Sequence, residues 1–495
     1  MLRAMSSRPA GTATAFHPST TADPSSAGAG RLREGGDRCP GATRLHEAAD
    51  GALARVRIPG GLLDVQQAEA IAAASRKLGD GAIHLTSRGN IELRGLPLEA
   101  GADLADRLHA AGLLPSVVHE RARNVVASPL SGLDAAGLLA GQGDVQRWVR
   151  ELDRLLCADQ RLTQLSGRFL FGFDDGRGDI LSLAPDVTVV AVSPERAEVV
   201  LNGSPIGVTV PAALAARAAI VVAHTFLDRT AAGSGDAWRL ADLSAADRTT
   251  LATGVRECLL NGAAGGSVIS YSVTSDPAGN DPVANDPVNN TADGPVRPDA
   301  AGAPRLGYVL GPDGSAALSV GAPLGRVSLT AWNALVRTTI RGGRTLRLTP
   351  WRGVVLPGFA VADAAGALAG LSDCGLLTEP ESPWVGATAC VGRPGCAKAL
   401  ADVHDDARRA LVAPAMATVP MTTCATAGTA VEGAGIPPLA VHWSGCERRC
   451  GHPIGAHVDV VATDAGYRIG TSGRQPVEVT NSEMAQAVSA ARSAM

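Results

Sequence analysis

The chain has 495 residues, 45% of them hydrophobic, and a formal net charge of −4 at pH 7. This length and apolar content predict several domains with cores of their own. The slight negative charge and the aromatic content of only 3% argue against a nucleic-acid partner, since phosphates attract basic surfaces and bases stack on aromatic rings. We find neither a secretory signal nor an uncharged apolar run long enough to cross a membrane, so we expect a cytoplasmic protein with no membrane partner.

Two segments of biased composition divide the chain. Residues 1–36 are rich in Ser, Thr, Ala, Gly and Pro and show no periodicity, which is typical of a disordered tail. Residues 274–304 repeat Asp-Pro units, which interrupt helices and sheet ladders, and they predict a disordered linker. We therefore expect one folded half on each side of the linker.

The two halves resemble each other. In the first, residues 54–61 read as a strand that ends in a turn, and Asp64 is placed to cap a helix with one apolar face. The segment HLTSRGNIELRGL, which starts at His84, aligns without a gap with RLTPWRGVVLPGF, which starts at Arg347. A repeat on this scale implies duplication and a pseudo-twofold arrangement. Each unit reads as a strand–helix–strand–strand–helix half of a ferredoxin-like sheet.

Four cysteines in the second half are spaced like metal ligands. Cys390 and Cys396 form a C-x5-C pair, and Cys446 and Cys450 form a C-x3-C pair, both embedded in glycine and proline. Small residues let backbone approach a bulky inorganic core, and four thiolates are the ligand set of a cubane iron–sulfur cluster. The spacing favours this cluster over zinc, whose knuckles are usually C-x2-C or C-x4-C. A zinc site and thiols without metal stay open as alternatives.

The duplication is chemically asymmetric at this point. RARNVVASPLSGLD follows the first unit, whereas GATACVGRPGCAKALAD follows the second. The first half offers arginines where the second offers thiols. We therefore expect one half to hold a metal and the other to face the substrate.

The duplicated unit and the two cysteine motifs resemble the nitrite/sulfite reductase family, from about Cys39 to the C-terminus without the linker. The resemblance implies an α+β fold, a duplicated nitrite/sulfite reductase fold with two ferredoxin-like half-domains and two sirohaem/Fe–S-type α/β domains in pseudo-twofold arrangement. The implied divisions are a tail (1–36), a first half-domain (37–115), a cluster-free domain (116–273), the linker (274–304), a second half-domain (305–380) and a [4Fe-4S]-binding domain (381–495).

The resemblance also assigns site residues. The run from Thr86 through Arg88 to Asn90 resembles the family's T-x-R-x motif, and Arg123 begins a run that resembles its R-N-V motif. The arginines of both motifs face the family's active site. Arg121 and Arg168 are further candidates for substrate binding. Cys390, Cys396, Cys446 and Cys450 would hold the [4Fe-4S] cluster.

One departure separates the chain from the reductases of that family. Residues 165–170 resemble an L-P-R-K-F-K run, whose lysines deliver protons and hold the anion in sulfite and nitrite reductases. Arg168 and Leu170 stand there instead, and the only lysines of the chain are Lys77 and Lys398. Arginine is a poor proton donor because its pKa is above about 12. The departure disfavours six-electron reduction, which consumes protons at each stage.

The remaining motifs resemble a branch of the family, the precorrin-3B synthases. They are Arg38–Gly41 with His46 and the A-D-G run, G-R-F followed by D-D-G, and the S-G-C-x3-C-x-H-P run. The branch implies an iron–sulfur monooxygenase of aerobic cobalamin biosynthesis, which hydroxylates C20 of the tetrapyrrole precorrin-3A with O2 and closes a γ-lactone. It also implies a mononuclear non-haem iron, for which the candidate ligands are His46, His84, His119 and His442.

An external electron-donating reductase is expected as a partner, because no G-x-G-x-x-G follows a strand and no nicotinamide site is predicted. Two alternatives stay open. A sirohaem-dependent nitrite or sulfite reductase would bind sirohaem as cofactor. A non-catalytic Fe–S electron carrier or zinc-stabilised binding protein would need no tetrapyrrole cavity.

Overall fold

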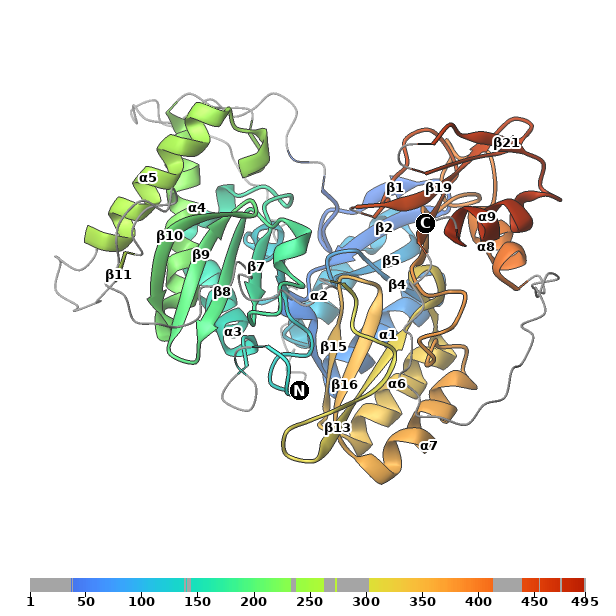
Figure 1. Cartoon of the computed structure of the whole chain (residues 1–495), viewed down its shortest axis with the longest axis horizontal. Coiled ribbons are helices and arrows are strands. Elements are labelled where there is room, and N and C mark those ends of the chain that lie inside the picture. The colour runs from blue at the N-terminus through green and yellow to red at the C-terminus, as the bar shows by residue number, and fades with distance from the viewer. Residues whose placement is uncertain are drawn as a thin grey trace, which may run out of the picture.

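The computed structural model consists of four sheets with their helices (Figure 1). In this view the two half-domains, blue and gold, lie between a green domain and a red C-terminal domain. The predicted tail and residues 274–301 of the predicted linker lie outside the described residues. The structure describes residues 37, 39–137, 139, 144–232, 237–261, 272–273, 302–412, 439–453, 455–471 and 474–493.

The first half-domain sheet is antiparallel and carries α1 (Val65–Leu78) and α2 (Gly101–Ala110). As predicted, Asp64 caps α1: its carboxylate accepts the Gln67 N–H at 2.8 Å, and the Gln67 side chain accepts the Asp64 N–H at 3.2 Å. The strands, in spatial order, are β1 (His46–Ala48), β2 (Gly51–Val56), β5 (Ile91–Leu96), β4 (Ala82–Leu85) and β14 (Arg326–Ser328).

The second half-domain repeats this arrangement with α6 (Leu329–Arg341) and α7 (Val361–Ser372). Ser328 caps α6 as Asp64 caps α1. The strands, in spatial order, are β12 (Gly307–Leu310), β13 (Ser315–Gly321), β16 (Gly353–Ala360), β15 (Thr345–Leu348) and β3 (Leu62–Asp64).

Each half-domain gives one strand to the other, which the sequence did not predict. β14 pairs with β4 of the first half, and β3 pairs with β15 of the second. The turns before these strands are left-handed at Gly60, Gly61, Leu324 and Gly325, with φ of 60°, 71°, 52° and 81°. A Cβ on Gly61 would overlap the Leu348 carbonyl oxygen, so only glycine lets the two halves approach this closely.

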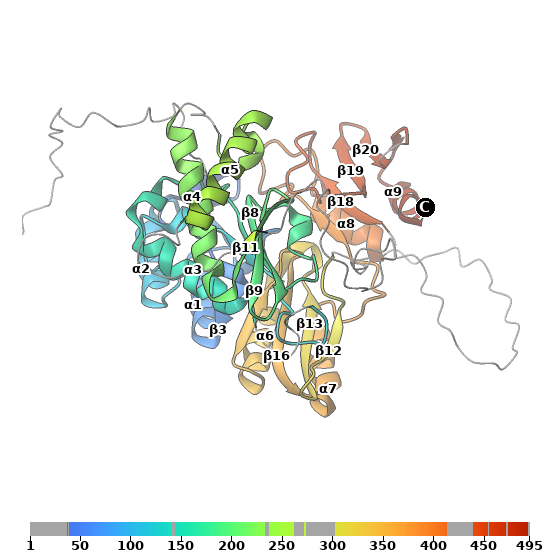
Figure 2. The same cartoon turned by 60° about the vertical axis from the view of Figure 1, so that its left-hand side comes forward.

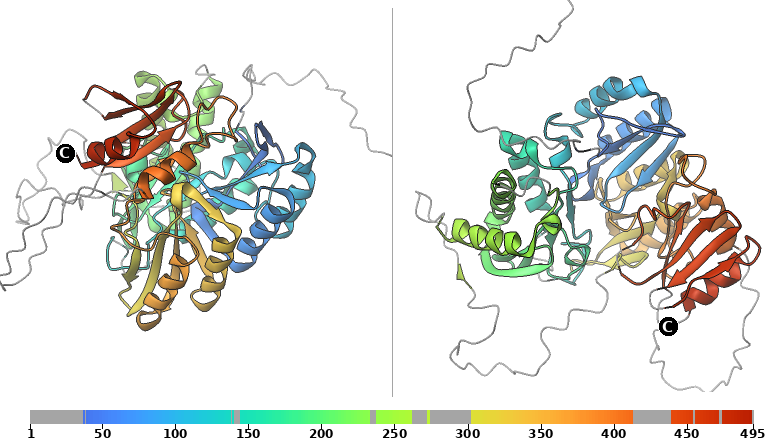
Figure 3. Two further views of the ribbon diagram at one scale, coloured as in Figure 1. Left: turned by 90° about the vertical axis from the view of Figure 1, so that its right-hand side faces the viewer. Right: turned by 90° about the horizontal axis from the view of Figure 1, so that it is seen from above.

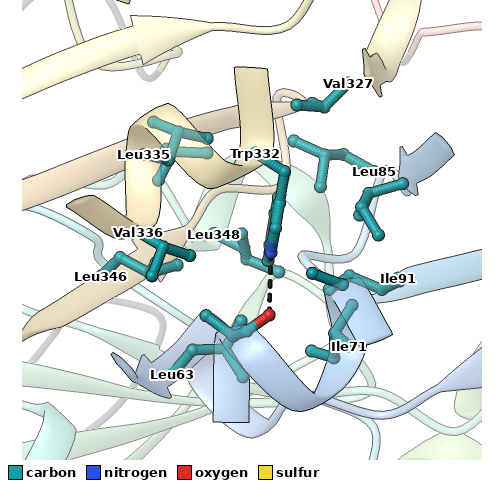
Figure 4. Packing of buried hydrophobic residues seen from close by; sticks show 14 of the residues in the cluster. Leu63, Ile71, Leu85, Ile91, Val327, Trp332, Leu335, Val336, Leu346 and Leu348 are labelled. Atoms are coloured by element: carbon teal, nitrogen blue, oxygen red, sulfur yellow. Dashed lines mark hydrogen bonds between the residues drawn. The ribbon is translucent and has the colours of Figure 1, made fainter. Parts of the chain in front are cut away.

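The exchange produces one hydrophobic core that spans both half-domains. α1 and α6 pack together, and the buried Trp332 donates its indole N–H to the Ala68 carbonyl at 2.9 Å (Figure 4). Leu63 and Leu346 belong to this core although they come from different halves. Because neither half can bury its apolar face alone, we infer that the two fold as one unit.

The other two sheets share their strand order and directions. In the cluster-free domain, β6 (Val125–Ala127), β7 (Phe171–Asp174) and β8 (Val187–Ser193) are parallel, and β9 (Arg196–Leu201), β10 (Ser204–Pro211) and β11 (Ser272–Val273) follow antiparallel. Its helices are α3 (Gln146–Ala158), α4 (Ala215–Ala231) and α5 (Ala245–Asn261), and α4 and α5 lie on one face of the sheet (Figure 2).

The C-terminal domain repeats the pattern. β17 (Ala387–Ala389), β18 (Ala440–Ser444) and β19 (His457–Thr463) are parallel, and β20 (Gly466–Thr471) and β21 (Val477–Val479) are antiparallel. Its helices are α8 (Val403–Val412) and α9 (Met484–Ser493). From above, the half-domains separate this domain from the cluster-free one (Figure 3). The predicted duplicated α+β fold is confirmed. None of the helices among the described residues is both long enough and apolar enough to cross a membrane.

Candidate functional site

The two cysteine motifs meet at one edge of the C-terminal sheet. β17 and β18 are parallel, with Ala389 opposite Trp443, so Cys390 and Gly445 emerge together at their carboxyl ends. The Gly445 N–H points at the Cys390 sulfur at 3.1 Å, and the Gly445 carbonyl accepts the Leu400 N–H at 2.7 Å. The loops that carry all four cysteines are therefore interlocked.

The glycines of these loops serve close packing. A Cβ on Gly392, whose φ is 64°, would lie 2.6 Å from Val403, and a Cβ on Gly445 would lie 2.7 Å from the Ala399 side chain. Burial raises the pKa of the Cys390 thiol, and the N–H groups of Gly445 and Gly392 act against this rise. N–H groups aimed at sulfur favour a thiolate, so the residues present fit a metal cluster. The described cysteines are all free of disulfides.

His442 holds the second cysteine loop. This fully buried imidazole lies on β18, with Nδ1 2.8 Å from the Thr388 hydroxyl and Nε2 3.1 Å from the Cys450 carbonyl oxygen. Burial, and then the charge of Arg352, lower the pKa of His442 to about 3. The ring is therefore neutral and donates Nε2–H to that carbonyl.

Arg94 holds the first cysteine loop from another domain. Its guanidinium on β5 grips the Asp50 carboxylate at 3.0 and 2.9 Å and donates to the Gly395 carbonyl, next to Cys396, at 3.2 Å. The Arg94 side chain is only 5% exposed. Asp50 belongs to the A-D-G run, so this motif anchors the loop between Cys390 and Cys396 to the first half-domain.

Arg94→Met is expected to leave the four cysteines in place but to loosen their loop. We predict that metal is lost to a chelator roughly 10-fold faster than from the unaltered protein, as for other outer-shell partners of metal ligands. The rate can be followed by the bleaching of the chromophore. Arg107→Met, which removes the Asp103 pair on α2, is the matched control and should leave that rate unchanged.

A second constellation surrounds the carbonyl oxygen of Gly167. It accepts hydrogen bonds from Arg57 at 3.1 Å, Arg88 at 3.4 Å and the Asn124 amide at 3.3 Å. Arg57 lies between β2 and the Pro59 turn, Arg88 belongs to the T-x-R-x motif, and Asn124 belongs to the R-N-V motif. Three distant segments thus converge on one peptide group of a fourth segment, which we call the Gly167 node.

Asp37 ties the C-P-G segment to the same node. Its carboxylate accepts the N–H groups of Gly167 at 2.6 Å and Cys39 at 3.0 Å, and the Ser166 hydroxyl at 3.2 Å. Burial alone would raise the pKa of Asp37, but these hydrogen bonds outweigh it and lower that pKa. Burial and Asp37 together raise the pKa of the neighbouring Cys39 thiol.

The other residues of the T-x-R-x motif shape the node. The Thr86 hydroxyl accepts the N–H groups of Arg88 at 3.3 Å and Asn90 at 3.1 Å, which closes the turn. The buried Asn90 amide accepts the Ile58 N–H at 2.9 Å and donates to Asn124 at 3.3 Å. Thr86 therefore fixes the backbone of Arg88, which is half-buried, and Asn90 links the same turn to Ile58 and Asn124.

The remaining predicted arginines are placed differently. The Arg121 side chain is 38% exposed and lies 3.9 Å from Asp37, and Arg168 is exposed. Arg123 is buried and grips Asp153 at 2.6 and 2.9 Å, and its third donor reaches the Leu113 carbonyl at 2.8 Å. The structure thus brings Arg88 to the node and engages Arg123 elsewhere.

Sequence reasoning missed Arg57. It is 2% exposed, and it donates to the Asn124 side chain at 2.8 Å as well as to Gly167. Burial, and then the charges of Arg55 and Arg88, lower its pKa to about 9. The signal was present: Arg55 and Arg57 alternate in the predicted strand of residues 54–61, although β2 itself ends at Val56.

The histidine candidates for a mononuclear iron lie apart. His84 pairs with Asp80 at 3.0 Å, and His119 contacts the Ser116 hydroxyl at 2.7 Å. His442 holds the cysteine loop, and His46 is exposed on the edge strand β1. The structure therefore gives His84, His119 and His442 separate partners and does not bring the four side chains together.

An acidic loop in the cluster-free domain is the counterpart of the cysteine loops. Ser128 follows β6 as Cys390 follows β17. The acidic loop runs from Asp174, the last residue of β7, to Asp179, and β7 is the equivalent of β18. The Ser128 hydroxyl donates to Asp179 at 2.6 Å. Asp174 accepts four backbone N–H groups, from Gly176, Gly178, Ile180 and Leu181, at 2.9–3.0 Å. Hydrogen bonds to carboxylates thus join the loops of the first repeat.

Asp179→Asn is expected to stabilise the protein in a pH-dependent way. Burial, and then the charge of Asp174, raise the pKa of Asp179 from 3.8 to about 7. The folded state therefore binds a proton that the unfolded state has released, and Asp179 lowers stability progressively as pH rises between these values. The gain in unfolding free energy should grow from about pH 4 to pH 7 and then stay constant. Urea titrations at pH 4 and pH 8 test this, with the exposed Asp106→Asn as control.

Comparison with known proteins agrees with this architecture. Residues 46–111 match the family model of the nitrite/sulfite reductase ferredoxin-like half domain. The chain is 36% identical to the ferredoxin–nitrite reductase of Synechococcus elongatus over 145 residues, which are 29% of this chain and 28% of that protein. It is 23% identical to a precorrin-3B synthase of Sinorhizobium sp over 440 residues, which are 88% and 82% of the two chains.

The solved structure of the NirA protein of Mycobacterium tuberculosis has the same fold, with a TM-score of 0.62 at 18% identity over 88% of this chain and 79% of that one. The chain therefore has the fold of this structure and is similar to nitrite/sulfite reductases in its first half-domain. It is similar to the precorrin-3B synthase over most of its length, whereas it spans less than a third of the nitrite reductase.

Proposed function

We propose that the protein is a precorrin-3B synthase-like monooxygenase, which hydroxylates C20 of precorrin-3A with O2 and closes a γ-lactone. The proposal accords with the family's oxidoreductase chemistry and with the relative that covers 88% of the chain. In the overall reaction one oxygen atom enters the product, and the other leaves as water after taking up two electrons and two protons. An external reductase supplies the electrons.

The position of Leu170 favours this proposal over the reduction of sulfite or nitrite. Leu170 stands where the sulfite and nitrite reductases place a lysine, and it is 4% exposed in a small apolar cluster with Val126 and Ile180. Its neighbour Arg168 is exposed. Neither side chain can serve as the proton donor that repeated reduction of a small anion requires.

Cys390, Cys396, Cys446 and Cys450 would hold a [4Fe-4S] cluster, which supplies electron transfer when bound. The chain's own residues do the rest. Arg94 and His442 keep the two cysteine loops in position, and Arg88 at the Gly167 node offers a fork of donors for a substrate carboxylate. The partly exposed Arg121 and the exposed Arg168 would meet the substrate's outer carboxylates. Because the four histidine candidates lie apart, we propose no ligand set for a mononuclear iron.

The test is incubation of anaerobically purified protein with precorrin-3A, a reductant and O2. A product heavier by one oxygen atom would support the proposal. Absence of this product, together with reduction of sulfite or nitrite, would overturn it.

A sirohaem-dependent reductase is the second candidate, and the 36% identity to a nitrite reductase over 145 residues favours it. Extractable sirohaem and a strong Soret band in the purified protein would identify it as a sirohaem-dependent reductase.

A further inference from the structure

The turn between β15 and β16 in the second half-domain repeats the turn between β4 and β5 in the first. The Thr349 hydroxyl accepts the Gly353 N–H at 3.0 Å, and the Thr349 N–H donates to the Gly353 carbonyl at 2.9 Å. Thr86 closes the first turn in the same way. In the aligned repeat, Trp351 therefore stands where the first half-domain has Arg88.

Both turns reach the same short segment of the cluster-free domain. The Arg88 guanidinium donates to the Gly167 carbonyl at 3.4 Å. The Trp351 side chain packs against the small apolar cluster that contains Leu170, three residues further along the chain. A cationic side chain from one half-domain and an aromatic side chain from the other thus contact the two ends of one segment.

Arg352, the next residue of the turn, reaches the C-terminal domain. Its guanidinium donates to the Gly451 carbonyl at 3.5 Å, directly after Cys450 in the second cysteine loop. A Cβ on Gly325 would lie 2.6 Å from the Arg352 side chain, so this glycine leaves room for the arginine. The turn therefore contacts the cluster-free domain through Trp351 and the second cysteine loop through Arg352.

The Trp351 ring is only partly buried. Trp148, Trp332 and Trp443 are 3% exposed or less, and each belongs to the large core of a domain. Trp351 instead packs against a small separate cluster and keeps part of its surface accessible. Large aromatic side chains that are supported on one side and accessible on the other are typical of binding surfaces.

We propose that Trp351 determines specificity for a tetrapyrrole, because its indole packs against the ring of the ligand while Leu170 supports it from behind. The inference rests on the proposed function, which supplies the tetrapyrrole. Such a macrocycle is a broad apolar surface with carboxylates only at its edge. An aromatic side chain stacks on a ring of this kind, whereas sulfite or nitrite offers no surface for it.

The test measures the binding of two porphyrins to the full-length protein. Uroporphyrin III and coproporphyrin III share one ring, but the second has fewer carboxylates. We expect Trp351→Ala to weaken the binding of both by the same factor, about 10-fold, because the lost contact is to the ring. Trp351→Phe, which keeps an aromatic ring, should retain most of the affinity. Unchanged affinity of Trp351→Ala for both porphyrins, or a loss for uroporphyrin alone, would overturn the inference.

Trp384→Ala is the matched control. Trp384 is also partly buried, but it packs against the core of the C-terminal domain and precedes β17, at the end of that strand opposite to Cys390. Its loss should lower the melting temperature and leave porphyrin affinity per folded molecule unchanged. Should Trp351→Ala not fold, Trp351→Leu keeps an apolar side chain against Leu170 without an aromatic ring. Porphyrin binding by Trp351→Leu as tight as by the unaltered protein would equally overturn the inference.

These outcomes separate the ring contact from the proposed function. Porphyrin binding that depends on Trp351, without C20 hydroxylation of precorrin-3A by the unaltered protein, would keep the contact and reject the function. Hydroxylation together with unchanged porphyrin affinity in Trp351→Ala would keep the function and reject the contact. Sirohaem that is bound by the unaltered protein and lost from Trp351→Ala would keep the contact and favour the second candidate function.

Discussion

Cys446→Ser protein is expected to be purified without a visible chromophore and without turnover. Cys446 directly follows Gly445, whose N–H points at the Cys390 sulfur. Its substitution therefore removes a thiol from the place where the two cysteine loops meet. A cubane cluster needs all four cysteine ligands, and we expect iron and labile sulfide to fall from roughly four per chain to near zero. Metal analysis, labile-sulfide assay and the absorption spectrum measure this directly.

The control is Cys374→Ser, which alters a half-buried cysteine packed against the core of the half-domains. It should keep full iron and sulfide content. Retention of the cluster by Cys446→Ser would reject the four-cysteine ligand set, and zinc without sulfide in the unaltered protein would identify a zinc site instead.

Arg123→Met is expected to destabilise the protein and to leave ligand binding intact. The Arg123 guanidinium is 4% exposed and makes two hydrogen bonds to Asp153, so its removal strands a partly buried carboxylate. Breaking a buried pair on one side costs about 3 kcal/mol. Denaturant unfolding of the unaltered protein and of Arg123→Met measures the change in stability. The affinity of both proteins for uroporphyrin III, a stable octacarboxylate tetrapyrrole, measures ligand binding.

We therefore predict opposite effects on ligand affinity for the loss of Arg123 and the loss of Arg88, although both arginines were selected by motif resemblance. If Arg123→Met kept its stability and lost affinity for the probe, the arginine of the R-N-V motif would be a binding residue. Asp153→Asn offers an independent check, because it should weaken the same pair without touching the arginine.

The sequence was sufficient where signals were local or periodic. The capping residue Asp64 predicted the start of α1, and the aligned segments that start at His84 and Arg347 predicted the duplication. The cysteine spacing predicted that two segments would approach each other, which they do at the ends of β17 and β18. Each of these features depends on residue type at a fixed separation along the chain.

The sequence was insufficient where the outcome depended on which groups meet across domains. Strand exchange between the half-domains arises from left-handed turns whose direction a pattern of residues does not reveal. The role of an arginine depends on its neighbours: Arg123 finds Asp153 on α3, whereas Arg57 finds only uncharged acceptors.

Residue identity alone thus determined that the chain is a duplicated α+β protein with thiols in one repeat and arginines in the other. Tertiary structure decided how these groups are used. It attached the first cysteine loop to Arg94 of the first half-domain, and it brought three distant segments to the carbonyl of Gly167. The reason is physical: the covalent chain sets which charges exist, but only packing decides which of them are left without a partner.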